Sequence, residues 1–141
     1  MPSDEGLRLI DALEELAREL LTELDADACV VSRVLGDVLV IVTHASNDDA
    51  VLNLGQGFLV SDFPPTKAVV DSGDPAVLTL DDPGVDSAEA ALLIELGYAT
   101  LLMTPLRVRD EQWGLFEVYR RDARPFGAAE VETATRRARI G

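Results

Sequence analysis

Apolar and polar positions alternate most clearly between residues 99 and 121, where two apolar runs flank a short polar segment. The polar segment, residues 110–112, is typical of a hairpin turn, so the pattern predicts two long antiparallel strands. The first strand is apolar on both faces at its start, which indicates that other elements cover both faces. Pro105 has no amide hydrogen and predicts a bulge or an unpaired position. Alternation along the second strand predicts one shared face for Trp113, Leu115, Glu117 and Tyr119.

Leucines recur at helical spacing over residues 3–24, which predicts a first helix with a wide apolar stripe. The stripe consists of Leu9, Leu13, Leu16, Leu20 and Leu24. The opposite face of this helix is acidic. A closing helix over residues 128–139 is only weakly apolar, and its basic residues come late, where they suit a helix C-terminus.

The middle of the chain predicts shorter elements. Residues 28–35 and 38–45 are predicted as strands, and Gly36–Asp37 between them has the composition of a type II′ turn. Residues 38–42 are continuously apolar, so we expect both faces of the second strand to be covered. A strand fragment punctuated by Gly55 and Gly57, a helix over 65–72, a strand over 76–80 and a helix from Asp86 or Ser87 to Gly97 follow. Asp86 and Glu89 have capping-box spacing. This order predicts an α+β fold on a central, mainly antiparallel sheet of five to six strands.

Length, charge and cysteine content exclude several classes of protein and of binding partner. The 141 residues suffice for a single domain. Because the helical pattern continues to the last residues, we expect either a module excised from a longer protein or a small stand-alone homologue of such a module. A net charge of −14 disfavours binding to nucleic acid or to an anionic membrane. The start has no apolar signal region, and no apolar run is long enough to span a bilayer, so we expect a cytoplasmic protein. Cys29 is the only cysteine, which excludes an internal disulfide and favours a buried apolar role.

Four features, in this order and spacing, resemble the GAF domain family over roughly residues 7–137. They are the acidic, leucine-rich first helix running into ACVVSRVLGDVLVIV, the segment GQGFLVSDFP leading to a helix and SGDPAV, the hairpin ELGYATLLMTPLRVRDEQWGLFEVYRR, and the closing helix start RPFGAAEVE. The resemblance implies an antiparallel sheet with the terminal helices on one face, where they often dimerise. Short helices and loops on the other face would close a small-molecule pocket. It also makes the terminal helices neighbours, so we expect Glu14, Glu15 or Glu19 to face Arg136 or Arg137.

Specific activities of the family do not carry over. The Asn-Lys-x-x-Asp-Glu pattern of cyclic-nucleotide-binding GAF domains is not visible. Ser61-Asp62-Phe63-Pro64 is similar to the segment that precedes the chromophore cysteine in phytochromes, but no cysteine follows it. GAF-fold methionine sulfoxide reductases need several cysteines. We therefore predict no enzymatic activity.

Reactive side chains show no convergent set. The paired acids Asp48–Asp49 and Asp81–Asp82 lie in expected turns, where aspartate is ordinary. His44 is the only histidine, and it reads as an ordinary strand-end residue rather than a haem ligand. We predict no catalytic residues, no metal site and no cofactor.

The candidate ligand site is the pocket side of the sheet. Its expected walls are Phe58, Phe63, Tyr98, Met103 and Trp113, and its expected polar contacts are Arg33, Thr104 and Glu117. The alternative is that these residues only fill the core. The leading interpretation is a non-catalytic sensory or regulatory module that binds an unidentified small molecule and signals through its terminal helices as a homodimer. A ligand-free dimerisation scaffold is the alternative, and a GAF-fold enzyme is less favoured. The ligand and the output domain stay open.

Overall fold

The computed structural model describes residues 4–47 and 55–140, with backbone only for residues 4–7. Its helices are α1 (Asp4–Glu23), α2 (Pro64–Ser72), α3 (Ser87–Leu96) and α4 (Ala128–Arg137), and a short 3-10 turn, η1 (Val60–Asp62), precedes α2. Its strands are β1 (Ala28–Leu35), β2 (Val38–Ser46), β3 (Gly57–Leu59), β4 (Ala76–Thr79), β5 (Thr100–Val108), β6 (Glu111–Arg120) and β7 (Arg139–Ile140). The expected elements lie close to their expected bounds; residue 3, expected in the first helix, lies outside the described residues.

The strands of the described residues form one seven-stranded sheet. Six of them follow the order β3-β2-β1-β6-β5-β4, and every neighbouring pair is antiparallel. The α+β prediction with a mainly antiparallel sheet is confirmed, and β7 is the difference. The closing helix was expected to reach residue 139, but α4 ends at Arg137. The amide of Arg107 in β5 then donates to the carbonyl of Ala138, and the amide of Arg109, just after β5, donates to that of Ile140. The chain after α4 therefore pairs with the edge of β5 as a short parallel strand.

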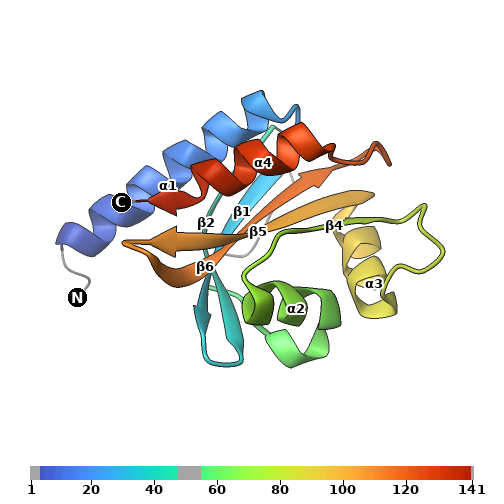
Figure 1. The fold of residues 1–141 in the computed structure, drawn as a ribbon, viewed down its shortest axis with the longest axis horizontal. Coiled ribbons are helices and arrows are strands. Elements are labelled where there is room, and N and C mark those ends of the chain that lie inside the picture. Colours follow the sequence, from blue (N-terminus) through green and yellow to red (C-terminus); the bar gives the residue numbers. More distant parts are fainter. Residues whose placement is uncertain (1–3, 48–54, 141) are drawn as a thin grey trace.

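Two layers of helices enclose the sheet (Figure 1). α1 and α4 cover one face, where Leu13 and Ala134 pack with Phe116 of β6 in one buried cluster. α2 and α3 lie on the opposite face, where Val69 and Leu93 belong to a second cluster. The expected division, with terminal helices on one face and short helices on the other, is confirmed. We call these the helix face and the pocket face of the sheet.

The central hairpin turns more tightly than the sequence predicts. Its two turn residues are Arg109 and Asp110, with φ of 53° and 65°, and β6 already begins at Glu111. Positive φ at both central positions is the type I′ geometry that matches strand twist. The turn prediction for residues 110–112 was therefore wrong by about a residue. The bulge also differs from the prediction, because Pro105 pairs with Leu115 and the register shifts only after Leu106.

Gly114 allows β1 and β6 to lie close together. A Cβ atom at this position would come within 1.9 Å of the Ser32 carbonyl oxygen, so no other residue fits without moving the backbone. The close approach expected at this glycine is therefore confirmed. It keeps β1 and β6 paired at the centre of the sheet, where the functional site begins.

Arg120 closes the helix face at the end of β6. Its side chain is 1% exposed and donates to the carbonyl oxygens of Leu24, Asp25, Arg124 and Pro125. It also pairs with Glu130 of α4, and its guanidinium carbon lies 4.0 Å from the centre of the Phe126 ring. One buried cation thus joins the end of α1, the loop after β6 and the start of α4.

α1 and α4 are joined by charge as well. Arg137 of α4 pairs with Glu19 of α1 and lies 3.3 Å from Glu23. The expected meeting of the acidic and basic faces is confirmed for Glu19 and Arg137. No helix within the described ranges has the length and apolar character needed to cross a membrane.

Candidate functional site

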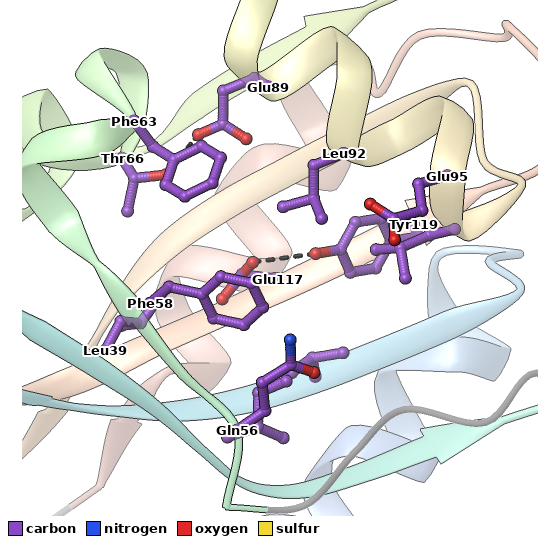
Figure 2. A pocket seen from close by; sticks show the side chains of 13 residues that line it. Leu39, Gln56, Phe58, Phe63, Thr66, Glu89, Leu92, Glu95, Glu117 and Tyr119 are labelled. Atoms are coloured by element: carbon purple, nitrogen blue, oxygen red, sulfur yellow. Dashed lines mark hydrogen bonds between the residues drawn. The ribbon is translucent and has the colours of Figure 1, made fainter.

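A cavity of about 330 Å³ lies on the pocket face, between the sheet and the short helices (Figure 2). The strands contribute Val30 of β1, Leu39 and Ile41 of β2, Phe58 of β3, and Glu117 and Tyr119 of β6. The loop and helix side contributes Gln56, Phe63, Thr66, Glu89, Leu92, Glu95 and Leu96. The cavity therefore has an apolar and aromatic wall with several carboxylates set into it.

Local periodicity explains how the polar groups reach this space. Glu117 and Tyr119 are two residues apart on β6, so both side chains point to the pocket face. On α3, Glu89, Leu92 and Leu96 are three and four residues apart and form one helical stripe toward the cavity. Ile94 lies on another side of the same helix and is 66% exposed.

Glu117 is the buried carboxylate that the sheet contributes to the cavity. It is only 9% exposed, and it accepts hydrogen bonds from the Tyr119 hydroxyl at 2.9 Å and the Ser32 hydroxyl at 3.2 Å. Burial and, to a smaller extent, the nearby Glu89 carboxylate together raise the pKa of Glu117 to about 7, although the two hydrogen bonds oppose the shift. Near neutral pH this side chain therefore exists in both the charged and the neutral form.

Glu89 is a second buried carboxylate from a different element. It is 2% exposed, and the Thr66 hydroxyl of α2 donates to it in a short hydrogen bond. Burial raises the pKa of Glu89, and the charge of Asp86 acts in the same direction, while the bonds from Thr66 lower it. Asp86, not Glu89, caps α3, since its carboxylate accepts from the amides of Ala88 and Glu89 at 3.1 Å each.

A family model for the GAF domain matches residues 8–139. The chain belongs to the GAF domain family. No curated protein sequence matches it. Its fold is similar to the blue-light-absorbing form of the PixJ GAF domain of Thermosynechococcus elongatus, at 16% identity and a TM-score of 0.80, covering 99% of this chain and 86% of that one.

Two further solved structures broaden the comparison. The phycocyanobilin-bound GAF domain of a cyanobacterial phytochrome has 21% identity and a TM-score of 0.75, covering 92% of this chain and 79% of that one. The GAF domain of a two-component sensor histidine kinase from Bacillus halodurans has 12% identity and a TM-score of 0.68, covering 88% of this chain and 86% of that one. Likeness at these identities establishes the fold of this GAF domain.

Three of the sequence-predicted site residues line the cavity of this GAF domain. They are Phe58, Phe63 and Glu117. The two phenylalanine rings meet edge to face, with centroids 6.1 Å apart. Tyr98 and Met103 lie deeper, within the core cluster of the pocket face. Tyr98 stacks on the Tyr119 ring at a centroid distance of 5.0 Å, so it supports a pocket wall from behind.

The other three lie elsewhere. Thr104 pairs with Phe116, so it faces the helix layer, and its buried hydroxyl has no hydrogen-bond partner among the described residues. Trp113 packs against the helix-face cluster, and the Arg33 guanidinium carbon lies 4.5 Å from its ring centre. Trp113 lies on the helix face because of the bulge after Leu106. The bulge interrupts the strand alternation, which the sequence prediction had extended through this residue.

Sequence reasoning missed Thr66, Glu89 and Tyr119. Tyr119 was detectable, because strand alternation already placed it on the same face as Glu117. Glu89 was assigned to a capping role by its local spacing from Asp86, and only the fold reveals Thr66 beside it. Its helical stripe with Leu92 and Leu96 was the available signal.

The remaining candidates within the described residues do not line the cavity. Cys29 packs in the helix-face cluster, where burial raises the pKa of its thiol, in line with the apolar role expected for it. Asp82 accepts from the Gly84 amide at 2.8 Å in an exposed turn, and Asp48 and Asp49 lie outside the described residues. Within the described part of the chain, no three His, Cys, Asp or Glu side chains gather as metal ligands would.

Proposed function

We propose that this GAF domain is a non-catalytic sensory or regulatory module that binds a small molecule in the cavity beside Glu117. The observation that carries the proposal is a cavity of about 330 Å³ with two buried carboxylates in an apolar wall. Ligand sites of proteins combine an apolar lining with a few placed polar groups, and their volumes begin near this size. Its occupant is accordingly a compact molecule.

Strand β6 connects this cavity to the terminal helices. Glu117 and Tyr119 face the cavity, and the next residue, Arg120, holds the end of α1 and the start of α4 on the other face. A ligand changes the helices only if it binds one arrangement of this strand better than another. We propose that binding shifts this arrangement and that α1 and α4 pass the change to a second copy in a cytoplasmic homodimer.

The solved relatives support a sensory role through their descriptions. One is phycocyanobilin-bound, and another belongs to a two-component sensor histidine kinase. A covalently attached chromophore is not part of the proposal, because the only cysteine, Cys29, lies in the cluster on the helix face of the sheet. We propose a reversibly bound ligand instead.

Native mass spectrometry of the purified protein tests this function. The wild type is expected to carry a reproducible small mass that denaturation removes. Leu92→Trp, which fills the cavity from α3, should lose that mass. Ile94→Trp adds the same bulk at the exposed side of α3 and should keep it. A wild type at bare chain mass, with no thermal stabilisation by any member of a metabolite library, would contradict ligand binding and favour a dimerisation scaffold.

A further inference from the structure

The cavity concentrates negative charge at a place shaped to receive a small molecule. Glu117 comes from β6 and Glu89 from α3, and Figure 2 shows both carboxylates directed into the same space. Glu95 of α3 adds a third carboxylate at the exposed edge. Among the described residues that line the cavity, none is Lys, Arg or His.

Two carboxylates that share a buried space are costly while both are charged. Each loses hydration on burial, and the two charges repel one another. Protonation relieves this cost, which is why burial and Glu89 together raise the pKa of Glu117. A positively charged ligand would relieve the same cost and gain an ion pair.

Glu117 keeps hydrogen-bonding capacity for such a ligand. An ionised carboxylate accepts about four hydrogen bonds, two at each oxygen. One oxygen accepts from Tyr119 and the other from Ser32. Each oxygen therefore retains a lone pair that an N–H group in the cavity can use.

The walls fit the body of the same kind of ligand. The rings of Phe58, Phe63 and Tyr119 line the cavity together with aliphatic side chains of β2 and α3. Aromatic faces attract ammonium and guanidinium groups, and they also bury flat apolar groups. The net charge of −14 favours the approach of cations and opposes that of anions.

We infer that the pocket selects a small organic cation, an ammonium or guanidinium group on a compact apolar body, whose N–H groups donate to Glu117 and Glu89. The inference rests on the proposed function and names the chemical class of its ligand. It separates this pocket from sites built for anionic ligands, which rely on basic side chains.

Isothermal titration calorimetry with three probes of one shape tests the charge preference. Phenethylamine is a cation, phenethyl alcohol is neutral and phenylacetate is an anion. The titrations use phosphate buffer at about pH 8, where Glu117 is mostly ionised and the amine is mostly protonated. We expect phenethylamine to bind about tenfold more tightly than the alcohol, as for one charge-assisted contact. Phenylacetate should show no binding.

Variants assign the effect to the named residues. Glu117→Gln and Glu89→Gln should each weaken phenethylamine binding about tenfold and leave the alcohol nearly unchanged. Leu92→Trp should abolish binding of both, while Ile94→Trp and Glu111→Gln, at exposed positions away from the cavity, should bind like the wild type. Circular dichroism checks that each variant folds.

The possible outcomes distinguish the cation preference from the proposed small-molecule binding on which it rests. Equal affinities for the amine and the alcohol, both lost in Leu92→Trp, would overturn the cation preference and leave the small-molecule function standing. Amine binding that survives Leu92→Trp would place the cation on the acidic surface and overturn the inference. If no probe binds, the cation preference fails, and the native mass experiment alone decides whether the cavity holds a ligand.

Discussion

The two faces of β6 each bury a charged side chain, and the protein treats them in opposite ways. On the helix face, Arg120 donates to four backbone carbonyls, pairs with Glu130 and stacks on Phe126. On the pocket face, Glu117 accepts hydrogen bonds from two side chains of the described residues, Ser32 and Tyr119, and has another carboxylate, Glu89, nearby. The arginine is satisfied within the fold. The glutamate is left with unused acceptor capacity beside a cavity.

This difference separates a structural charge from a functional one. A buried charge that is fully paired contributes to one fixed arrangement, because removing it leaves its partners unsatisfied. A buried charge that is incompletely paired lowers stability and is retained where a ligand or a proton uses it. By this criterion Arg120 fixes the position of α1 and α4, and Glu117 defines the site.

Removing Arg120 should have the largest effect on the molecule. Arg120→Ala leaves Glu130 and several carbonyls at the ends of α1 and β6 without their donor, and we expect the free energy of unfolding to fall by about 3–5 kcal/mol. Urea denaturation followed by circular dichroism measures this loss.

Arg124→Ala is the matched control. Arg124 pairs with Asp25 at 3.0 Å, but both side chains are largely exposed, so the loss should be small compared with that of Arg120→Ala. If Arg120→Ala and Arg124→Ala lower the free energy of unfolding by similar amounts, Arg120 contributes no more than an exposed arginine. The distinction between the two faces of β6 would then be wrong.

Substitution of Glu117 should have the next largest effect on the free energy of unfolding, and the size of this effect should depend on pH. Its pKa is about 7 in the folded protein against an ordinary value of 4.5, so the folded state binds more protons between these values. The free energy of unfolding should therefore fall as the pH rises from about 5 to 8, and Glu117 should account for about 2–3 kcal/mol of this fall. Glu89 acts in the same sense, because its pKa is raised too.

Glu117→Gln isolates that contribution. The variant should be more stable than the wild type at about pH 8 and similar to it at about pH 5, as measured by urea denaturation across this range. Glu95→Gln, at an exposed carboxylate of the same cavity, should follow the wild-type curve. If the free energy of unfolding has the same pH dependence with and without Glu117, burial of this carboxylate does not destabilise the fold. The contrast with Arg120 would then be wrong.

The contrast also shows how far the sequence alone could lead. Alternation on β6 predicted the face of Glu117 correctly, because strand geometry is local. It failed for Trp113, because the bulge after Leu106 depends on the pairing of β5 with β6. Arg120 received no role from the sequence, since its partners Leu24 and Asp25 lie 96 and 95 residues earlier in the chain, where only the fold brings them to it.

The residues that line the cavity also divide into those that the sequence predicted and those that it did not. Phe58, Phe63 and Glu117 could be chosen from pattern and resemblance, and the structure places all three in its lining. Glu89 was not chosen, since its local spacing from Asp86 indicates a cap, and its actual partner Thr66 lies 23 residues earlier in the chain. Where a polar side chain has both a local and a distant use, only the tertiary structure decides between them.

The smallest effect should come from the exposed charges between α1 and α4. Arg137 pairs with Glu19 and lies 3.3 Å from Glu23, and all three side chains are partly exposed. Because solvent screens such pairs, Glu19→Arg or Arg137→Glu should each cost about 1 kcal/mol or less. Combining the two reversals restores one pair but brings a new carboxylate at position 137 toward Glu23, so the rescue should be partial. A double-mutant cycle in urea measures the coupling, which we expect at about 0.5 kcal/mol. A coupling as large as the Arg120 effect would mean that this pair, rather than the buried arginine, fixes the terminal helices relative to the sheet.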